Sequence, residues 1–227
     1  MYEQIFDRLI EGEPVLENEA SNFQSCVAII NDGRIKGTGV LIAPNIVMTA
    51  YHVVTAISGN TVKVSNGLKA FSSSSFTGKR IPEKIITEDR PHRPVGLGFI
   101  LLDISLPFAI ERASEKEVAQ QHEGQIVGYG RNTNGDYGVK SKTDVLIKSD
   151  NQGDLLTKAF IASGQKDGIN PTDSGAPLYI KLPNEILKLA GIANNHMGFG
   201  RLGRFIDVTE PNIEKQINDI ITSYPAN

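Results

Sequence analysis

Short apolar runs separated by turn residues recur along the whole chain, and they limit the fold more than any other feature. The runs include CVAII before NDG, TGVLIA before PN, QIVGY before RNTNG, and LAGIA near the carboxyl end. Runs of this length, bounded by Gly, Pro, Asn and Asp, are typical of β-strands. A chain of 227 residues can bury a full core. The pattern therefore predicts an all-β protein.

A polar and charged stretch separates these runs into two halves. It covers residues 109–124 and is predicted to cross between two subdomains, residues 9–108 and 125–208. Beyond them, four isoleucines recur at helical spacing after Thr209, which is the expected N-cap. Residues 209–227 are therefore predicted to form one amphipathic helix.

Charge and composition argue against several classes of partner. The net charge is -3 with the basic residues spread out, so we expect neither nucleic acid nor an anionic membrane as partner. No apolar run reaches about 18 residues, and acidic residues occupy the amino terminus, which favours a cytoplasmic protein. Cys26 lies in an apolar run and is expected to be a buried thiol. His92 and His122 lack ligand partners at metal spacing, so no metal or nucleotide cofactor is expected.

Two segments carry the residue types needed for catalysis by a serine. A serine hydroxyl is a weak nucleophile at neutral pH, so it needs an imidazole to take its proton and backbone amides to hold an oxyanion. Ser174 lies in PTDSGAPL, a turn of small residues before an apolar run. His52 lies in VMTAYHVV, directly after a predicted strand. These two residues are the candidate catalytic pair.

Both segments resemble motifs of the trypsin-like and chymotrypsin-like serine proteases. TDSGAPL resembles their GDSGGPL motif, and MTAYHVV resembles their TAAHC motif. Weaker similarities are TGVLIAPNIV, the GYG turn at Tyr129, LAGIANN and the final helix. The resemblance implies two six-stranded antiparallel β-barrels with a C-terminal helix. It also implies hydrolysis of protein or peptide substrates through an acyl-enzyme on Ser174, with His52 as general base.

The resemblance further implies an oxyanion hole and a substrate pocket. The amides of Thr172 and Ser174 would hold the oxyanion, although Thr172 replaces the glycine that is usual in the family. The pocket floor would lie near Gly168, with Asp167 adjacent. If Asp167 points into the pocket it favours Lys or Arg at the cleavage site, and otherwise it belongs to an exposed turn. Three consecutive residues would form the pocket wall: Asn194, Asn195 and His196.

An activation segment is implied at the amino terminus. RLIEGEPV, beginning at Arg8, resembles the RIVGG sequence at which zymogens of the family are cut. Cleavage by an activating protease would remove residues 1–8 as a propeptide and free the amine of Leu9 to pair with Asp173. The alternative is that this segment is only a solvated terminus.

The carboxylate that orients the histidine in this family is hard to find. One alignment of the strand that should carry it places Gly96 at the aspartate position. The other uses Asp103 but puts Pro107 inside a central strand, where proline removes a ladder hydrogen bond. We prefer the first alignment, with Asp89 as another candidate carboxylate.

Two functions from different classes follow from this choice. The retained His52 and Ser174 favour an endopeptidase, whereas Gly96 favours a weakened protease or an inactive pseudoprotease that binds a protein in its cleft. A chain in which Asp has been replaced by Gly at position 96 is a third interpretation.

Overall fold

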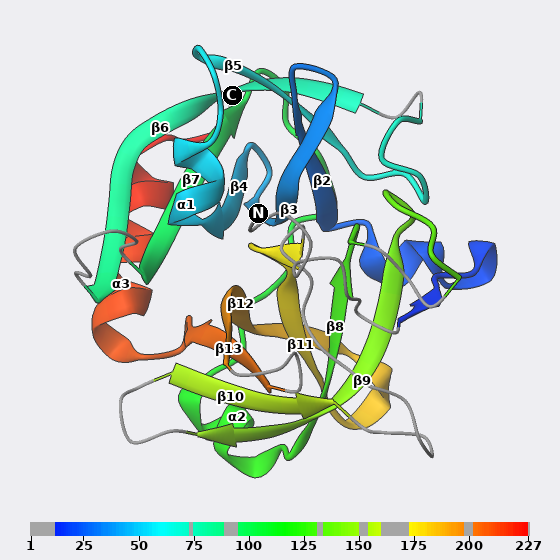
Figure 1. Ribbon diagram of the computed structural model, residues 1–227. Helices are drawn as coiled ribbons and strands as arrows, with labels where there is room; N and C mark the ends of the chain where they lie inside the picture. Colours follow the sequence, from blue (N-terminus) through cyan, green and yellow to red (C-terminus); the bar gives the residue numbers. More distant parts are fainter. Residues whose placement is uncertain are drawn as a thin grey trace, which may run out of the picture.

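The computed structural model describes residues 12–72, 75–88, 95–130, 134–149, 154–159, 173–197 and 202–226. Its strands gather into two groups (Figure 1). The first group is a closed antiparallel barrel in the order β2–β3–β4–β7–β6–β5. Its strands are β2 (Cys26–Asn31), β3 (Arg34–Ala43), β4 (Ile46–Ala50), β5 (Thr61–Ser65), β6 (Ser75–Glu88) and β7 (Val95–Leu102). A short helix, α1 (Tyr51–Thr55), follows β4 directly.

The second group is a sheet in the order β1–β9–β10–β13–β12–β11–β8. Its strands are β1 (Glu13–Pro14), β8 (Glu123–Gly128), β9 (Ser141–Ser149), β10 (Asp154–Ala159), β11 (Pro177–Lys181), β12 (Leu187–Met197) and β13 (Leu202–Asp207). Because β8 also pairs with β9, strands β8 to β13 form a closed circuit, and β1 is added beside β9. The predicted all-β fold of two antiparallel barrels is therefore confirmed.

The buried apolar side chains form three clusters, because neighbouring residues of a strand point to opposite faces. One cluster, with Val47 and Ile100, belongs to the first barrel and α1. Another, with Leu178 and Phe205, belongs to the second barrel and the segment leading into it. The third cluster draws on both barrels and the C-terminal helix, and we call it the shared cluster. Its members include Met48, Leu97, Phe99, Ile192, Ile206 and Ile217. The face on which the barrels meet is thus apolar.

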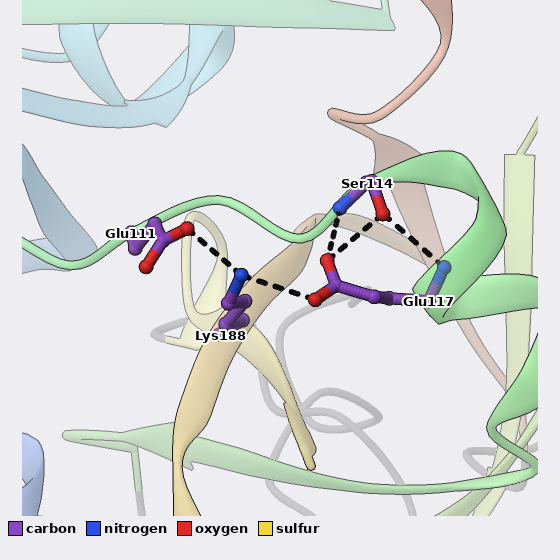
Figure 2. Close-up of polar contacts among 4 residues, drawn as sticks. All are labelled: Glu111, Ser114, Glu117 and Lys188. Carbon is purple, nitrogen blue, oxygen red and sulfur yellow. Dashed lines mark hydrogen bonds and ion pairs between the residues drawn. The ribbon is translucent and has the colours of Figure 1, made fainter.

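The predicted crossing, residues 109–124, contains α2 (Glu115–Gln120) and the start of β8. Figure 2 shows how it is fastened to β12. Lys188 Nζ lies 2.8 Å from Glu111 Oε1 and 3.0 Å from Glu117 Oε1. The Ser114 amide and hydroxyl donate to Glu117 Oε2 at 2.7 and 2.9 Å, which caps α2. These contacts link the crossing to the second barrel, while the division of the chain into domains there stays a prediction.

The C-terminal helix, α3 (Pro211–Ser223), is present as expected, and it packs against the first barrel (Figure 1). Its N-cap is Glu210, whose side chain accepts from Ile213 N at 2.9 Å, so the expected cap at Thr209 is wrong. Thr209 instead donates its hydroxyl to Asp207 at 2.7 Å. Asn45 Nδ2 donates to the Tyr224 carbonyl just beyond the helix. No helix within the described residues is long and apolar enough to cross a membrane.

Two short 3-10 helices complete the described elements. They are η1 (Glu17–Phe23), before the first barrel, and η3 (Pro183–Glu185), in the turn between β11 and β12.

Candidate active site

His52 lies where a fully buried strand turns into a helix. Every residue of β4 is buried, and α1 begins at Tyr51. Val53 and Val54 of α1 are buried in the first-barrel cluster, and they fix the helix to the end of the barrel. Ala50, the last residue of β4, pairs with Leu97 of β7. The sequence order of strand and then histidine therefore places a half-buried His52 at one end of the first barrel.

Ser174 lies in a tight turn before β11. The turn is closed by a 2.7 Å hydrogen bond from Ala176 N to the Asp173 carbonyl. Gly175 has φ +86°, a conformation that L side chains rarely adopt. Its amide donates to the Ala193 carbonyl at 2.7 Å. Ser174 is 7% exposed, so the turn is packed closely by its surroundings.

The first barrel holds the same turn from the other side. Thr38 N donates to the Ser174 carbonyl at 2.9 Å. Beside it, a Cβ built on Gly37 would lie 2.7 Å from the Ser174 carbonyl oxygen and 2.7 Å from Val53 Cγ2. Since Val53 directly follows His52, the serine turn and the histidine helix flank the same glycine. Both candidate catalytic residues therefore lie at the junction of the two barrels.

Two buried threonines that the sequence analysis did not single out tighten this junction. Thr49 Oγ1 donates to the Thr38 carbonyl at 2.6 Å, and Tyr129 N donates to Thr38 Oγ1 at 3.2 Å. Both threonines are fully buried. The available signal was a threonine inside an otherwise apolar run, because a buried hydroxyl needs a partner.

Asp173 is fully buried beneath the GYG turn. Gly130 N donates to Asp173 Oδ1 at 2.9 Å. A Cβ on Gly128 or Gly130 would lie 2.4 or 2.3 Å from a carboxylate oxygen of Asp173, so neither position has room for a side chain. The turn encloses the carboxylate. The predicted activation residues Arg8 and Leu9 lie outside the described residues.

The structure argues against Asp103 as the orienting carboxylate. Ala50 pairs with Leu97, so His52 lies near the first residues of β7, whereas Asp103 follows its last residue. Six residues of extended strand between Leu97 and Asp103 span roughly 20 Å. Asp103 is exposed, and its amide donates to the Thr77 carbonyl. Its carboxylate is therefore out of reach of the imidazole. The alignment that uses Asp103 was wrong because the sequence alone does not fix the pairing of β4 with β7.

Gly96 lies near the histidine end of β7, paired with Ile86 of β6. A Cβ built on it would lie 2.3 Å from the Ile85 carbonyl oxygen. At Gly98 a Cβ would lie 2.3 Å from Val54 Cγ2. Neither glycine has room for an aspartate on this backbone. The other candidate carboxylate, Asp89, lies outside the described residues.

Several expected pocket and oxyanion residues also lie outside the described residues, namely Thr172, Gly168 and Asp167. Asn195 and His196 belong to β12, but only their backbone is described. Asn194 is 4% exposed, and its Oδ1 is buried without a hydrogen-bond partner in the described part of the chain. Of the expected pocket wall, Asn194 alone has a described side chain.

A buried lysine, Lys140, lies beside the Tyr129 ring. Lys140 Nζ donates to the carbonyls of Phe23 and Asn66 at 2.8 and 2.7 Å, and it lies 5.5 Å from the Tyr129 ring centroid. Burial lowers the pKa of Lys140 to about 8. Burial also raises the pKa of Cys26 to about 12, so its thiol stays protonated and unreactive at neutral pH.

No group of His, Cys, Asp and Glu side chains within the described ranges could hold a metal ion. The arrangement offers instead a serine in a rigid turn and a histidine helix at a barrel junction. Together with the fold, these features define a two-barrel serine hydrolase.

The family is shown by comparison with protein-family models. The model described as Trypsin matches residues 11–211, so the chain belongs to the trypsin family. A search of curated proteins found no significant match. The chain is accordingly a trypsin-like serine peptidase, and a peptidase domain of this kind implies protein substrates.

Proposed function

We propose that the chain is an endopeptidase that cleaves through Ser174 and His52, with neither position 96 nor Asp103 supplying the carboxylate that orients the histidine. The observation that carries the proposal is the Ser174 turn, which is held by Thr38 from the first barrel and by Ala193 from the second. Such double anchoring presents the serine and its amide in one fixed geometry, which nucleophilic catalysis requires.

The proposed reaction follows the acyl-enzyme route. Ser174 Oγ attacks the peptide carbonyl carbon while its proton passes to His52. The oxyanion is held by the amides of Ser174 and Thr172. The tetrahedral intermediate expels the amine, which takes the proton from His52, and water then hydrolyses the ester by the same steps. Without an orienting carboxylate the rate is expected to be lower by up to about four orders of magnitude.

Activation by cleavage after Arg8 is part of the proposal. The freed amine of Leu9 would approach Asp173, whose carboxylate is fully buried beside the Gly130 amide. A buried carboxylate is strongly stabilised by a cation, so this pairing would order the serine turn. An Arg8→Gln variant should then resist activation by trypsin, while the wild-type chain gains reactivity.

The second candidate is a pseudoprotease that binds a protein in its cleft. The crowding at Gly96 and Gly98 favours it, because neither position accepts the missing aspartate on this backbone. The two candidates differ in whether Ser174 is chemically activated.

Labelling with a fluorophosphonate probe tests the proposal. The full chain should label before or after trypsin treatment, Ser174→Ala should not, and Ser58→Ala, at an exposed serine outside the site, should label like the wild type. Peptide hydrolysis followed by mass spectrometry would then identify the cleavage site. Absence of labelling in the wild type under both conditions would refute the endopeptidase and support the pseudoprotease.

A further inference from the structure

A cavity of about 390 Å³ lies on the first barrel where β2 pairs with β5. Its lining includes Ile30 of β2, Lys63 of β5, Asp32 of the β2–β3 turn, and Ala70 and Phe71 of the loop between β5 and β6. Ile30 and Ala70 are buried and supply apolar surface, whereas Lys63 and Phe71 are exposed. The volume falls within the range of ligand pockets, roughly 300–1,000 Å³. We call this site the Lys63 cavity.

The loop that contributes Phe71 to the Lys63 cavity is fastened to the second barrel. Tyr129 Oη donates to the Gly67 carbonyl at 2.7 Å. Three residues further on, Ala70 N donates to the Gly138 carbonyl at 2.8 Å. This wall of the cavity is therefore formed before any partner binds, which reduces the ordering cost of binding.

Two exposed aromatic side chains lie beside that second hydrogen bond. Phe71 follows Ala70 and is 61% exposed, and Tyr137 precedes Gly138 and is 47% exposed. Tyr137 Oη lies 3.4 Å from the carbonyl oxygen of Ile35, which follows the β2–β3 turn. Neighbouring exposed aromatic groups at the edge of a cavity are typical of a protein interface. The Lys63 cavity thus has an aromatic rim.

The surface around the Lys63 cavity is basic, although the chain as a whole carries a net charge of -3. Arg34 pairs with Asn31, and Lys79 pairs with Thr61, and both partners line the cavity. Four exposed cations therefore belong to the lining or adjoin it: Arg34, Lys63, Lys69 and Lys79.

These four cations are available to a partner. Two carboxylates oppose them, Asp32 in the lining and Asp136 next to Tyr137, so four positive charges stand against two negative ones. None of the four cations forms an ion pair with any part of the chain that the structure describes. The Lys63 cavity therefore complements a partner of negative charge.

Strand β3 connects the Lys63 cavity to the serine turn. It begins at Arg34, beside the cavity, and reaches Thr38, whose amide donates to the Ser174 carbonyl. Four residues of extended strand span roughly 13 Å. A polypeptide bound in the cavity can therefore reach Ser174 with about four or five further residues.

We propose that the Lys63 cavity binds an acidic peptide segment of a partner protein. One aromatic or large aliphatic side chain of the segment packs on Ile30 and Ala70, and its carboxylates pair with the surrounding cations. A concave apolar site suits a peptide side chain better than the surface of a bilayer. The proposal concerns recognition, so it applies to the endopeptidase and to the pseudoprotease alike.

Fluorescence polarisation of a labelled peptide with the full chain tests the proposal. The probe is fluorescein-DEDFEED, and its control is fluorescein-DEDAEED, which keeps the charge and lacks the aromatic ring. We expect saturable binding of the first peptide and binding at least about 5-fold weaker for the second. Raising the salt concentration from 50 to 300 mM should weaken the binding of both.

Two substitutions at exposed positions locate the binding site. Lys63→Glu should weaken binding of DEDFEED about 10-fold or more at 50 mM salt, and Phe71→Ser about 5-fold or more. Lys148→Glu, at an exposed lysine of β9, and Ile186→Ser, at an exposed isoleucine between β11 and β12, are the matched controls. Both controls should bind like the wild type, and thermal denaturation checks that all four variants fold.

Several results would overturn the proposal. These are no saturable binding to the wild type, equal binding of the two peptides, or unchanged binding in both Lys63→Glu and Phe71→Ser. Co-sedimentation with phosphatidylserine vesicles that depends on Lys63, without peptide binding, would assign the surface to a membrane instead. Self-association of the wild type that Lys63→Glu abolishes, again without peptide binding, would assign it to a second copy of the chain.

The peptide measurement does not depend on the chemistry of Ser174. If DEDFEED binds as expected but Ser174 does not label with the fluorophosphonate, the inference stands and the endopeptidase fails. If Ser174 labels but the peptide does not bind, the endopeptidase stands and the inference fails.

Discussion

The carbonyl oxygen of Ser174 accepts a 2.9 Å hydrogen bond from the amide of Thr38, and this bond joins the two halves of the chain at the nucleophile. Thr38 belongs to β3 of the first barrel, whereas Ser174 precedes β11 of the second. Thr49 donates to the carbonyl of the same threonine. The site is therefore a product of barrel docking, and a change that separates the barrels by a few tenths of an ångström should disturb the serine first.

Gly175 is the residue at which such a change is easiest to make. A Cβ there would lie 2.0 Å from Thr49 Oγ1 and 2.1 Å from the Thr38 carbonyl oxygen, and φ is +86°. We expect Gly175→Ala to lower the free energy of unfolding by about 2–4 kcal/mol and to abolish probe labelling of Ser174. Urea denaturation and labelling under native conditions measure the two effects.

Gly33→Asn is the matched control for Gly175→Ala. Gly33 also has a positive φ, +69°, but nothing lies within 4 Å of a Cβ built on it. Asparagine tolerates this conformation, so stability and labelling should change little. Equal effects of the two substitutions would show that the contact with Thr38 and Thr49 is not what matters.

An aspartate introduced at position 96 is expected not to increase the reactivity of Ser174, for a steric reason. The new Cβ would come within 2.3 Å of the Ile85 carbonyl oxygen, which is backbone and cannot rotate away. We expect Gly96→Asp to reduce stability by about 1–3 kcal/mol without raising the labelling rate. Gly96→Ala, which adds the same Cβ without a charge, should destabilise similarly. A faster reaction in Gly96→Asp at unchanged stability would contradict this and identify position 96 as a vacant triad site.

The sequence predicted the parts of the molecule that depend on local pattern. The apolar runs around Val47 and Leu178 have the length that is typical of strands, and both lie in strands of the predicted barrels. The isoleucines of the last helix have helical spacing, and Ile213 and Ile217 are buried as that spacing requires. The sequence also predicted that His52 follows a strand and that Ser174 lies in a turn before a strand, because both are local arrangements.

Register and tertiary contact could not be predicted in the same way. Asp103 resembles the family strand in letters, but its distance from His52 depends on the pairing of β4 with β7. Asn194 is the extra residue of a bulge in β12, and nothing in LAGIANN signals a bulge. Lys140 follows a glycine-containing turn and gives no local sign of burial. Each of these facts comes from a partner far away in the chain.

The network between the crossing segment and β12 predicts sensitivity to acid. Hydrogen bonds from the Ser114 amide, Lys188 and the Ser114 hydroxyl lower the pKa of Glu117 to about 2, against an ordinary value of 4.5. A lowered carboxyl pKa stabilises the fold above pH 4.5, and the contribution is lost as the pH falls from 4.5 to 2. We expect the stability of the wild type to fall more steeply over this range than that of Glu117→Gln. Urea denaturation at pH 5 and pH 3 measures this difference. An equal loss of unfolding free energy in the two proteins would exclude a role for Glu117.

Lys140 predicts the opposite behaviour at alkaline pH. Burial lowers its pKa to about 8 from 10.5, so the fold disfavours the charged form while the unfolded chain does not. The cost of burying that charge is fully present below pH 8, and it disappears as the pH rises from 8 to 10.5. It amounts to on the order of 3 kcal/mol.

Lys140→Met has no such charge but leaves the Phe23 and Asn66 carbonyls without their donor at every pH. Denaturation of both proteins at pH 7, 8.5 and 10 should show the difference in unfolding free energy, wild type minus Lys140→Met, increasing with pH. Because the Cys26 thiol and Lys140 interact electrostatically, both proteins are also measured with Cys26→Ser, and a difference that stays constant there would mean that Lys140 titrates normally in the fold.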